Sequence, residues 1–474
     1  MTLFRKLLLC WLVLLTESHF LIAQTLATQL NNAIKNLEAD LQLRHAIIGF
    51  SVVETKTGKP VFEHNAQTGL AAASCQKVLT SGAAFELLGK DYRYKTELGY
   101  DGKIDNGVLK GNLFVTGSGD PTLGSWRWTA TNESTVLHTW IEKIKKAGIY
   151  SVEGMILGDD RKWESATTPD GWIWQDIGNY YGAGASSLNW RENQYDLTLK
   201  AGGKVGDSCI IVSTTPHLFQ TQLICEVTAA EKGSGDNAYI YLPPYAPYGF
   251  VRGTIPAGAQ TFTISGAFAN SSVQFIFTLG EALQQAGVNK GMLFGSFYTP
   301  VVEKKNVLFQ VTPIYSHLSP TLDSINYWFL KRSINLYGEA LIKTIAYERA
   351  GKGSTQKGVE LVRDFWSRQG IDRSAINMLD GSGLSPQNRI TADALVKAMQ
   401  YARERPWFSS FYNALPEING LKMKSGSIGG ARSFTGYSKS KNGNEYTFAI
   451  IVNNYDGNAG ELVRKMYAVL DNLK

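Results

Sequence analysis

Histidine and cysteine are scarce in this sequence, and metal-binding spacings are missing. The 474 residues include six histidines and four cysteines, which form neither a His-Glu-x-x-His nor a Cys-x-x-Cys pattern. Runs of lysine and arginine are also missing, and the formal net charge is +6. The sequence therefore indicates no metal, no other cofactor and no nucleic-acid partner.

Long apolar runs are missing as well, apart from one near the N-terminus. Arg5 and Lys6 precede the apolar residues 7–15, a run too short to span a bilayer comfortably. Ala23 follows as a small residue at which cleavage can occur. We therefore expect residues 1–23 to be a signal peptide, and the protein to be exported to the periplasm or the cell surface.

Removal of that leader leaves three cysteines, Cys75, Cys209 and Cys225. An odd number in an exported protein leaves at least one free thiol. Cys209 and Cys225 lie in β-rich sequence, and whether they form a bridge is open. Cys75 is expected to pack as a small apolar residue.

Three short motifs occur in an order that has a chemical meaning. They are Ser-Cys-Gln-Lys at residues 74–77 (the first motif), Ser-Ile-Asn at residues 333–335 (the second motif) and Lys-Ser-Gly at residues 424–426 (the third motif). In this order they are the parts of an acylating serine site that uses lysine instead of histidine as its base.

The spacing within the first motif suits this chemistry. Residues i and i+3 of a helix share one face, so the Lys77 amine can reach the Ser74 hydroxyl. The N-terminus of the same helix offers free N–H groups to a developing oxyanion. A base has to lose its proton near neutral pH, so we expect Lys77 to be buried, with Lys424 as a second cation nearby.

Each motif alone is weak evidence for such a site, because the same residue types recur elsewhere in the sequence. Similar patterns begin at Ser354 and Ser438 (Ser-x-x-Lys), at Ser187 and Ser324 (Ser-x-Asn) and at Lys56 (Lys-Thr-Gly). Ser74 follows Ala71–Ala73 and opens a predicted helix that Gly89 ends, whereas Ser354 lies in a glycine-rich stretch and Ser438 in a polar turn. We therefore expect only Ser74 to combine a helix start with buried surroundings.

Longer blocks around the motifs carry a family resemblance. They are residues 117–123 with Gly-Asp-Pro-Thr-Leu, the Trp-rich block at 171–183, the second motif with its trailing helix at 332–341, and Asp-Gly-Ser-Gly-Leu-Ser at 380–385. With them the chain resembles, over nearly all of its length after the leader, the class C low-molecular-mass penicillin-binding proteins. These are D-alanyl-D-alanine carboxypeptidases and endopeptidases.

Three positions depart from the family pattern. Ile334 stands where the family usually has aspartate, the third motif reads Lys-Ser-Gly instead of Lys-Thr-Gly, and Cys75 follows the first serine. Ser425 keeps the hydroxyl of the third motif, and Ile334 leaves both polar ends of the second motif in place. The set of catalytic side chains is therefore complete.

The resemblance implies a catalytic role for four residues. Ser74 would be the acylated nucleophile and Lys77 its base. Ser333 would relay a proton toward the leaving amine, and Asn335 would hydrogen-bond the substrate amide. Neither a metal nor another cofactor takes part in these roles.

The resemblance also implies the substrate contacts. Lys424 and Ser425 would hold the substrate carboxylate, and the N–H group of Ser427 would complete the oxyanion hole with that of the nucleophile. Gly426 would let the substrate backbone approach closely. In the family an inserted acidic residue binds the free amine on the third residue of the wall peptide. Asp159 aligns best with that role, and the alternative is a solvated turn at a strand end.

The implied fold is an α/β fold. A β-lactamase/transpeptidase-like serine domain, with a central antiparallel sheet and helices, is expected from residues 24–95 and 283–474. A β-rich inserted domain is expected from residues 96–169 and 241–282, with a second insertion nested at 170–240. Within the serine domain we expect a helix near 26–43, a strand at 47–53, helices within 325–350 and 391–405, a strand at 446–452 and a terminal helix from about residue 461.

These expectations describe a serine D-Ala-D-Ala carboxypeptidase that is also a DD-endopeptidase. It would hydrolyse peptidoglycan stem peptides and crosslinks through an acyl-enzyme on Ser74, with β-lactams as covalent inhibitors. A β-lactamase is one alternative, although no motif identifies the deacylating base that it needs. A non-catalytic wall-binding or drug-sensing protein is another, disfavoured because all three polar motifs survive. The balance of the two peptidase activities and the oligomeric state stay open.

Overall fold

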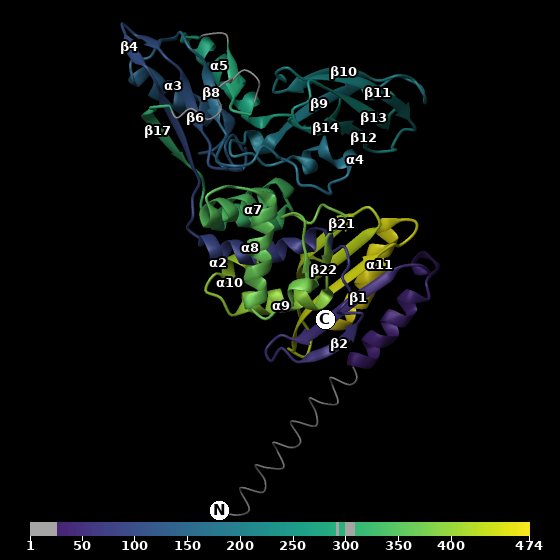
Figure 1. The fold of residues 1–474 in the computed structure, drawn as a ribbon. Coiled ribbons are helices and arrows are strands. Elements are labelled where there is room, and N and C mark those ends of the chain that lie inside the picture. Colours follow the sequence, from purple (N-terminus) through teal and green to yellow (C-terminus); the bar gives the residue numbers. More distant parts are fainter. Residues whose placement is uncertain (1–25, 291–292, 299–308) are drawn as a thin grey trace, which may run out of the picture. The chain divides into compact units, whose positions relative to one another are not determined.

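The computed structural model describes residues 26–290, 293–298 and 309–474 (Figure 1). The predicted signal peptide, residues 1–23, lies outside the described residues. The chain divides into two compact units. Unit 1 holds the described residues up to 82 together with 363–378 and 386–474, and unit 2 holds 83–362 and 379–385.

Unit 1 is built on a six-stranded antiparallel sheet. Its order is β2 (Pro60–His64), β1 (Ile47–Glu54), β23 (Glu445–Asn453), β22 (Ala431–Lys439), β21 (Leu421–Ile428) and β20 (Glu417–Ile418). Strand β1 pairs with β23 along its full length, from Ile47 opposite Asn453 to Glu54 opposite Tyr446. The prediction that two distant chain segments form one serine domain with a central antiparallel sheet is confirmed.

Helices bury both faces of this sheet because its central strands are apolar on both sides. The N-terminal helix, residues 26–38, and α11 (Ala459–Leu470) share one core with the sheet, in which Phe50 and Ile450 are fully buried. Helix α9 (Ala392–Arg403) contacts β1 and β23, where the alternate residues are buried as well. Figure 1 shows α11 beside β21 and β22. Each fully buried leucine, isoleucine or phenylalanine contributes about 1.5–3 kcal/mol.

The helix after the first serine, α2 (Lys77–Leu88), has apolar or small residues on almost every side, which is typical of a buried helix. It packs closely at Gly82, where a Cβ would lie 2.9 Å from Trp366 Cζ2. The Trp366 indole N–H donates to the Leu79 carbonyl at 3.0 Å. Gly89 follows the helix with a φ of +87°, which confirms the predicted glycine stop.

Unit 2 contains an α/β part and a β part. The α/β part has one sheet in the order β16 (Phe294–Ser296), β8 (Ile156–Asp159), β6 (Leu113–Thr116), β3 (Lys95–Tyr100) and β17 (Thr312–Leu318), and a second in the order β15 (Asn289–Lys290), β7 (Ser151–Val152), β5 (Val108–Lys110) and β4 (Lys103–Asp105). Two helices absent from the sequence analysis, α3 (Glu133–Lys146) and α5 (Ser271–Gln285), pack here. Each begins at an asparagine cap, Asn132 and Asn270.

The β part has two three-stranded sheets. Their orders are β10 (Ile210–Thr215), β9 (Gln194–Lys200), β14 (Phe262–Ala267) and β11 (Gln222–Ala230), β13 (Tyr248–Pro256), β12 (Asn237–Tyr241). Alternate residues of these strands, such as Leu197, Ile240 and Val251, form one core. The exact borders of the inserted domains stay a prediction.

Helices α6 (Leu322–Lys331) and α7 (Asn335–Ala350) lead into and out of the second motif. Helices α8 (Thr355–Arg368) and α10 (Phe408–Ala414) follow later in the chain. The chain breaks between α6 and α7 at Ser333, whose φ is +58°. None of the described helices is long and apolar enough to cross a membrane. In the described part of the chain, the three cysteines are free thiols.

Candidate active site

Ser74 lies in a 3₁₀ turn, Ala73–Gln76, directly before α2. The preceding residue, Ala73, has a φ of +45°, a left-handed conformation that costs a non-glycine residue on the order of 1–3 kcal/mol. The Cys75 N–H donates to the Ala72 carbonyl at 3.1 Å and closes the turn. The predicted helix start at Ser74 is therefore confirmed, with a strained residue in front of it.

Lys77 begins α2 and is completely buried. Its Nζ lies 2.9 Å from Ser74 Oγ and donates a hydrogen bond to it. The three-residue spacing thus does bring the amine to the hydroxyl, in the buried environment that a base requires. A neutral amine at the same distance can accept the serine proton.

The pattern that begins at Ser354 shows why the sequence alone could not separate the two serines by helix start. Ser354 also precedes a helix, α8, and its Oγ accepts a hydrogen bond from the Lys357 N–H at 3.2 Å as an N-terminal cap. Both serines therefore stand at a helix start, and only Ser74 combines that start with buried surroundings, as expected. Burial separates them, because the Lys357 side chain is 42% exposed and pairs with Glu360 whereas Lys77 is 0% exposed.

The third motif lies on β21, against the turn of the first serine. Lys424 is buried, and its Nζ donates to the Ser425 carbonyl at 2.7 Å. Burial lowers the pKa of Lys424 to about 8. The Cys75 thiol donates to the Lys424 carbonyl at 3.1 Å, and burial raises the pKa of Cys75 to about 11. Cys75 is therefore a packed thiol, as expected, and it links the first motif to the third.

Gly426 has a structural reason in addition to the expected approach of the substrate backbone, which stays a prediction. A Cβ on Gly426 would lie 2.3 Å from Ser433 Oγ, 2.4 Å from the Ala72 carbonyl and 3.0 Å from the Cys75 nitrogen. The chain's own turn that carries Ser74 therefore approaches Gly426 closely. Strand β21 continues past this glycine to Ile428.

The second motif lies in unit 2 at the start of α7. Ser333 has its left-handed φ in the link between α6 and α7, and Asn335 is the first residue of the helix. Asn335 Nδ2 donates to the Tyr181 carbonyl at 2.7 Å. This contact joins the second motif to the Trp-rich block, to which the sequence alone assigned no structural role.

Further polar side chains of α7 hold the segments around that block. The Glu339 carboxylate accepts the Gly381 N–H at 3.1 Å, and Lys343 Nζ donates to the Ala185 carbonyl at 3.1 Å. Burial raises the pKa of Glu339 and lowers the pKa of Lys343, each to about 8. The sequence analysis did not single out these residues, although a glutamate and a lysine four residues apart on an otherwise apolar helix are a usable signal.

The Asp-Gly-Ser-Gly-Leu-Ser block fastens the Trp-rich block directly. Asp380 accepts the Trp172 indole N–H at 2.9 Å and the Ser385 N–H at 2.7 Å. Ser385 Oγ donates to the Gly171 carbonyl at 3.0 Å. Three of the four blocks that carry the family resemblance, residues 171–183, 332–341 and 380–385, are thus packed together within unit 2.

Asp159, the predicted amine-binding residue, ends β8 in an ion pair. Arg161 Nη2 lies 2.7 Å from Asp159 Oδ2, and the Arg161 guanidinium also lies 3.8 Å from the centre of the Phe297 ring. The carboxylate lines a depression of about 640 Å³ that also has Lys162 and Lys352 in its wall. An amine would therefore meet a carboxylate that already has a cationic partner.

Asp176 is a second carboxylate, which the sequence analysis did not assign. It lies in α4 (Trp174–Ile177), where burial raises its pKa and the Tyr181 hydroxyl hydrogen-bonds it. The carbonyl of the same Tyr181 is the acceptor of Asn335. Two contacts therefore connect Asp176 to the second motif.

No metal-binding cluster is present among the residues that the structure describes. No group of three or more histidine, cysteine, aspartate or glutamate side chains is arranged there to hold an ion. That the site needs no cofactor stays a prediction from the serine chemistry.

Comparison with known proteins agrees with this geometry. The family model described as the D-Ala-D-Ala carboxypeptidase 3 (S13) family matches residues 30–473. The chain is 26% identical over 476 residues to the D-alanyl-D-alanine carboxypeptidase of Actinomadura sp. (strain R39), covering 93% of this chain and 84% of that protein. It is 23% identical to the D-alanyl-D-alanine carboxypeptidase DacB of Haemophilus influenzae, covering 88% of this chain and 87% of the relative.

Solved structures show the shared fold. The crystal structure of penicillin binding protein 4 from Haemophilus influenzae has a TM-score of 0.78 at 22% identity, covering 93% of this chain and 98% of that chain. A structure of the same protein complexed with a β-lactam has a TM-score of 0.72 at 22% identity, covering 93% and 97%. The predicted fold class is confirmed.

The tight approach at Gly426 predicts a position-specific loss of stability. Gly426→Ala should lower the free energy of unfolding by about 1–3 kcal/mol, because the new methyl group overlaps fixed backbone atoms. The matched control is Gly429→Ala in the adjoining turn, where a Cβ meets no described atom within 4 Å. Thermal unfolding of both variants measures the difference, and equal melting temperatures would contradict it.

Proposed function

The chain belongs to the D-Ala-D-Ala carboxypeptidase 3 (S13) family, and on this premise we propose that it is a serine D-Ala-D-Ala carboxypeptidase that also acts as a DD-endopeptidase. Its substrates in this proposal are peptidoglycan stem peptides and their crosslinks. The observation that carries the proposal is the fully buried Lys77 amine, 2.9 Å from Ser74 Oγ. The two relatives named D-alanyl-D-alanine carboxypeptidase support the choice of substrate.

Acylation in this proposal begins with proton transfer. The neutral Lys77 amine takes the hydroxyl proton while Ser74 Oγ forms a bond to the carbonyl carbon of the penultimate D-alanine. The N–H groups of Ser74 and Ser427 stabilise the oxyanion of the tetrahedral intermediate. The C–N bond then breaks, Ser333 passes a proton to the departing amine, and Asn335 holds the substrate amide. Water hydrolyses the resulting ester and restores the serine.

Recognition of the terminal carboxylate is assigned to the third motif. Lys424 supplies the charge and Ser425 a hydroxyl donor, in a buried setting where a charge-assisted hydrogen bond contributes about 1.5–3 kcal/mol. Substrates that end in a free carboxylate are favoured for this reason. We propose further that β-lactams acylate Ser74, a reaction that the β-lactam complex of the structurally similar penicillin binding protein 4 supports.

Export completes the proposal. Residues 1–23 are proposed to direct the chain to the periplasm or the cell surface, where peptidoglycan is accessible. The serine domain, residues 24–95 and 283–474, is proposed to carry the nucleophile, with the inserted domains as the remaining parts.

The assignment of the nucleophile predicts a single site of modification. Penicillin should form an adduct on the peptide that contains Ser74, and Ser74→Ala should abolish it. The matched control is Ser354→Ala. Ser354 is also followed by a lysine three residues later, but the side chain of that lysine, Lys357, is exposed to solvent. Intact-protein and peptide mass spectrometry measures both variants, and an adduct retained in Ser74→Ala would rule out this nucleophile.

Turnover of a D-Ala-D-Ala peptide beside turnover of penicillin separates the peptidase from a β-lactamase.

The lowered pKa of Lys424, about 8, predicts a pH limit on substrate capture. The ammonium form binds the carboxylate, and this form is lost as the pH rises through that value. We expect kcat/KM for a D-Ala-D-Ala peptide to fall about tenfold per pH unit above pH 8. Lys424→Arg keeps its charge at every accessible pH, so its slower reaction should lack this alkaline decline. The same decline in both proteins would show that another group controls it.

The amine-binding role of Asp159 stays a prediction, with Asp176 as the competing carboxylate. If Asp159 binds the amine, Asp159→Asn should lower kcat/KM about 10- to 100-fold for peptides with a free side-chain amine on the third residue. Acetylated peptides should be slow in both the variant and the wild type. Asp176→Asn is measured in parallel. An intact amine preference in Asp159→Asn together with its loss in Asp176→Asn would move the role to Asp176.

A further inference from the structure

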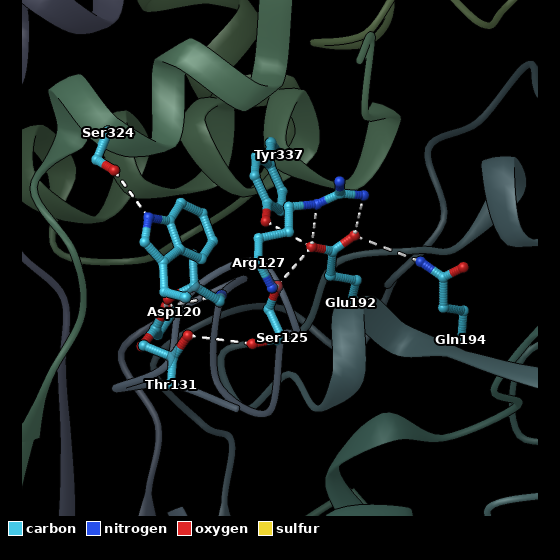
Figure 2. Close-up of polar contacts among 10 residues, drawn as sticks. Asp120, Ser125, Arg127, Thr131, Glu192, Gln194, Ser324 and Tyr337 are labelled. Atoms are coloured by element: carbon cyan, nitrogen blue, oxygen red, sulfur yellow. Dashed lines mark hydrogen bonds and ion pairs between the residues drawn. The ribbon is translucent and has the colours of Figure 1, made fainter. Parts of the chain in front are cut away.

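Glu192 is a buried carboxylate on which four described side chains converge (Figure 2). It accepts hydrogen bonds from Ser125 Oγ at 2.7 Å, Tyr337 Oη at 2.7 Å, Arg127 Nε at 2.7 Å and Arg127 Nη2 at 3.0 Å. Gln194 Nε2 lies 3.5 Å from its second oxygen. The Glu192 side chain is 0% exposed, so no water competes for these contacts. The proposed reaction gives this carboxylate no role.

The backbone around Glu192 is strained in a way that directs the side chain inward. Arg191, Glu192 and Asn193 have φ values of +52°, +54° and +54°, three successive left-handed residues without a glycine. The Asn193 side chain stabilises this turn, since its Oδ1 accepts the Trp190 N–H at 2.9 Å. Such a conformation persists only where the surroundings fix it, and residues of this kind cluster at functional sites.

The contact with Tyr337 reaches the first turn of α7. Tyr337 is fully buried and lies two residues after Asn335. The N-cap of α7 is Ile334, whose side chain makes no capping hydrogen bond to the described chain. An aspartate, which the family usually has at this position, would satisfy the free N–H groups of the helix end. The first turn of α7 is therefore held from outside, by Tyr337 and Asn335.

The segment that supplies Arg127 also holds α6, the helix on the other side of Ser333. The Arg127 guanidinium lies 5.1 Å from the ring centre of Trp328 on α6. The neighbouring Trp128 indole N–H donates to Ser324 Oγ on α6 at 2.8 Å. The left-handed residue Ser333 thus sits between two helices that are anchored to one buried ion pair.

We propose that Glu192 is a positioning residue for the second motif. Through Tyr337 it sets the rotation of the first turn of α7, and so the direction in which Asn335 and Ser333 present their polar groups. This inference rests on the proposed function, in which both residues act during acylation. A buried carboxylate with one cation is a poor source of stability compared with an apolar pair of the same shape, whereas its directed hydrogen bonds fix an orientation.

The test separates positioning from stability by comparing two buried tyrosines in unit 2. Tyr337→Phe removes only the hydroxyl that reaches Glu192. The matched control, Tyr195→Phe, removes a buried hydroxyl that has no hydrogen-bond partner in the described part of the chain. Stopped-flow acylation with a chromogenic penicillin yields the binding constant and the acylation rate constant of each variant, and thermal unfolding yields its melting temperature.

We expect Tyr337→Phe to lower the acylation rate constant about tenfold and to change the binding constant less than about threefold, as loss of transition-state positioning requires. Tyr195→Phe should keep the wild-type rate constant. A wild-type rate constant in Tyr337→Phe, or an equal decrease of the rate constant in both variants, would overturn the inference. The proposed function would still stand if the wild-type protein forms the Ser74 adduct. Absence of that adduct in the wild-type protein would overturn both.

A second variant keeps the test independent of one hydroxyl. Glu192→Gln should also slow acylation. The effects of Glu192→Gln and Tyr337→Phe on the logarithm of the rate constant should be strongly non-additive, because both substitutions break the same hydrogen bond between Tyr337 and Glu192. Additive effects would contradict the inference that Glu192 acts on the second motif through Tyr337. If Glu192→Gln fails to fold, the Tyr337→Phe comparison still decides the matter.

Discussion

Unit 1 depends on one constraint, that the amine of Lys77 is kept out of water and against the Ser74 hydroxyl. Burial of a lysine amine is costly unless the group is paired and hydrogen-bonded or loses its proton. The enclosure comes from an apolar helix, a sheet built from two distant chain segments, and strand β21, which lies against the turn that carries Ser74. The close approach of β21 explains two small residues. Gly426 has no room for a Cβ, and the Cys75 thiol donates a hydrogen bond to the Lys424 carbonyl. The unusual Cys75 is therefore a packing residue.

The second motif is held by a different kind of interaction. In unit 2, buried charged groups act on the helix that begins at Asn335, and each contact has a defined direction. Glu339 accepts the Gly381 N–H, Lys343 donates to the Ala185 carbonyl, and Tyr337 donates to Glu192. Apolar packing would stabilise such a helix but leave its rotation poorly determined. Buried polar contacts fix the rotation, which matters for a helix whose first residues present functional groups.

Local patterns were sufficient for the parts of the fold and site that local chemistry determines. The i, i+3 contact of Ser74 and Lys77, the glycine at residue 89 and the separate strands near 47–53 and 446–452 were readable from spacing and periodicity. The antiparallel sheet in which these two strands pair was implied only by the family resemblance. The helix start at Ser354 shows the limit, because a serine cap has the same local signal whether the next turn faces solvent or a core. Burial depends on the tertiary fold, and burial is what distinguishes the two serines.

Ala73 and Ser333 explain why the rest of the site could not be predicted from local sequence. Both are left-handed, non-glycine residues in the links that lead into α2 and α7, and neither residue type favours that conformation. The same holds for Glu192 in a stretch that reads as a solvated loop. Segments distant in sequence hold two of these residues in place: Ser433 Oγ donates to the Ala72 carbonyl beside Ala73, and Arg127 and Tyr337 donate to Glu192. These conformations therefore cannot exist in an isolated segment, and each forms only when the unit that encloses it folds.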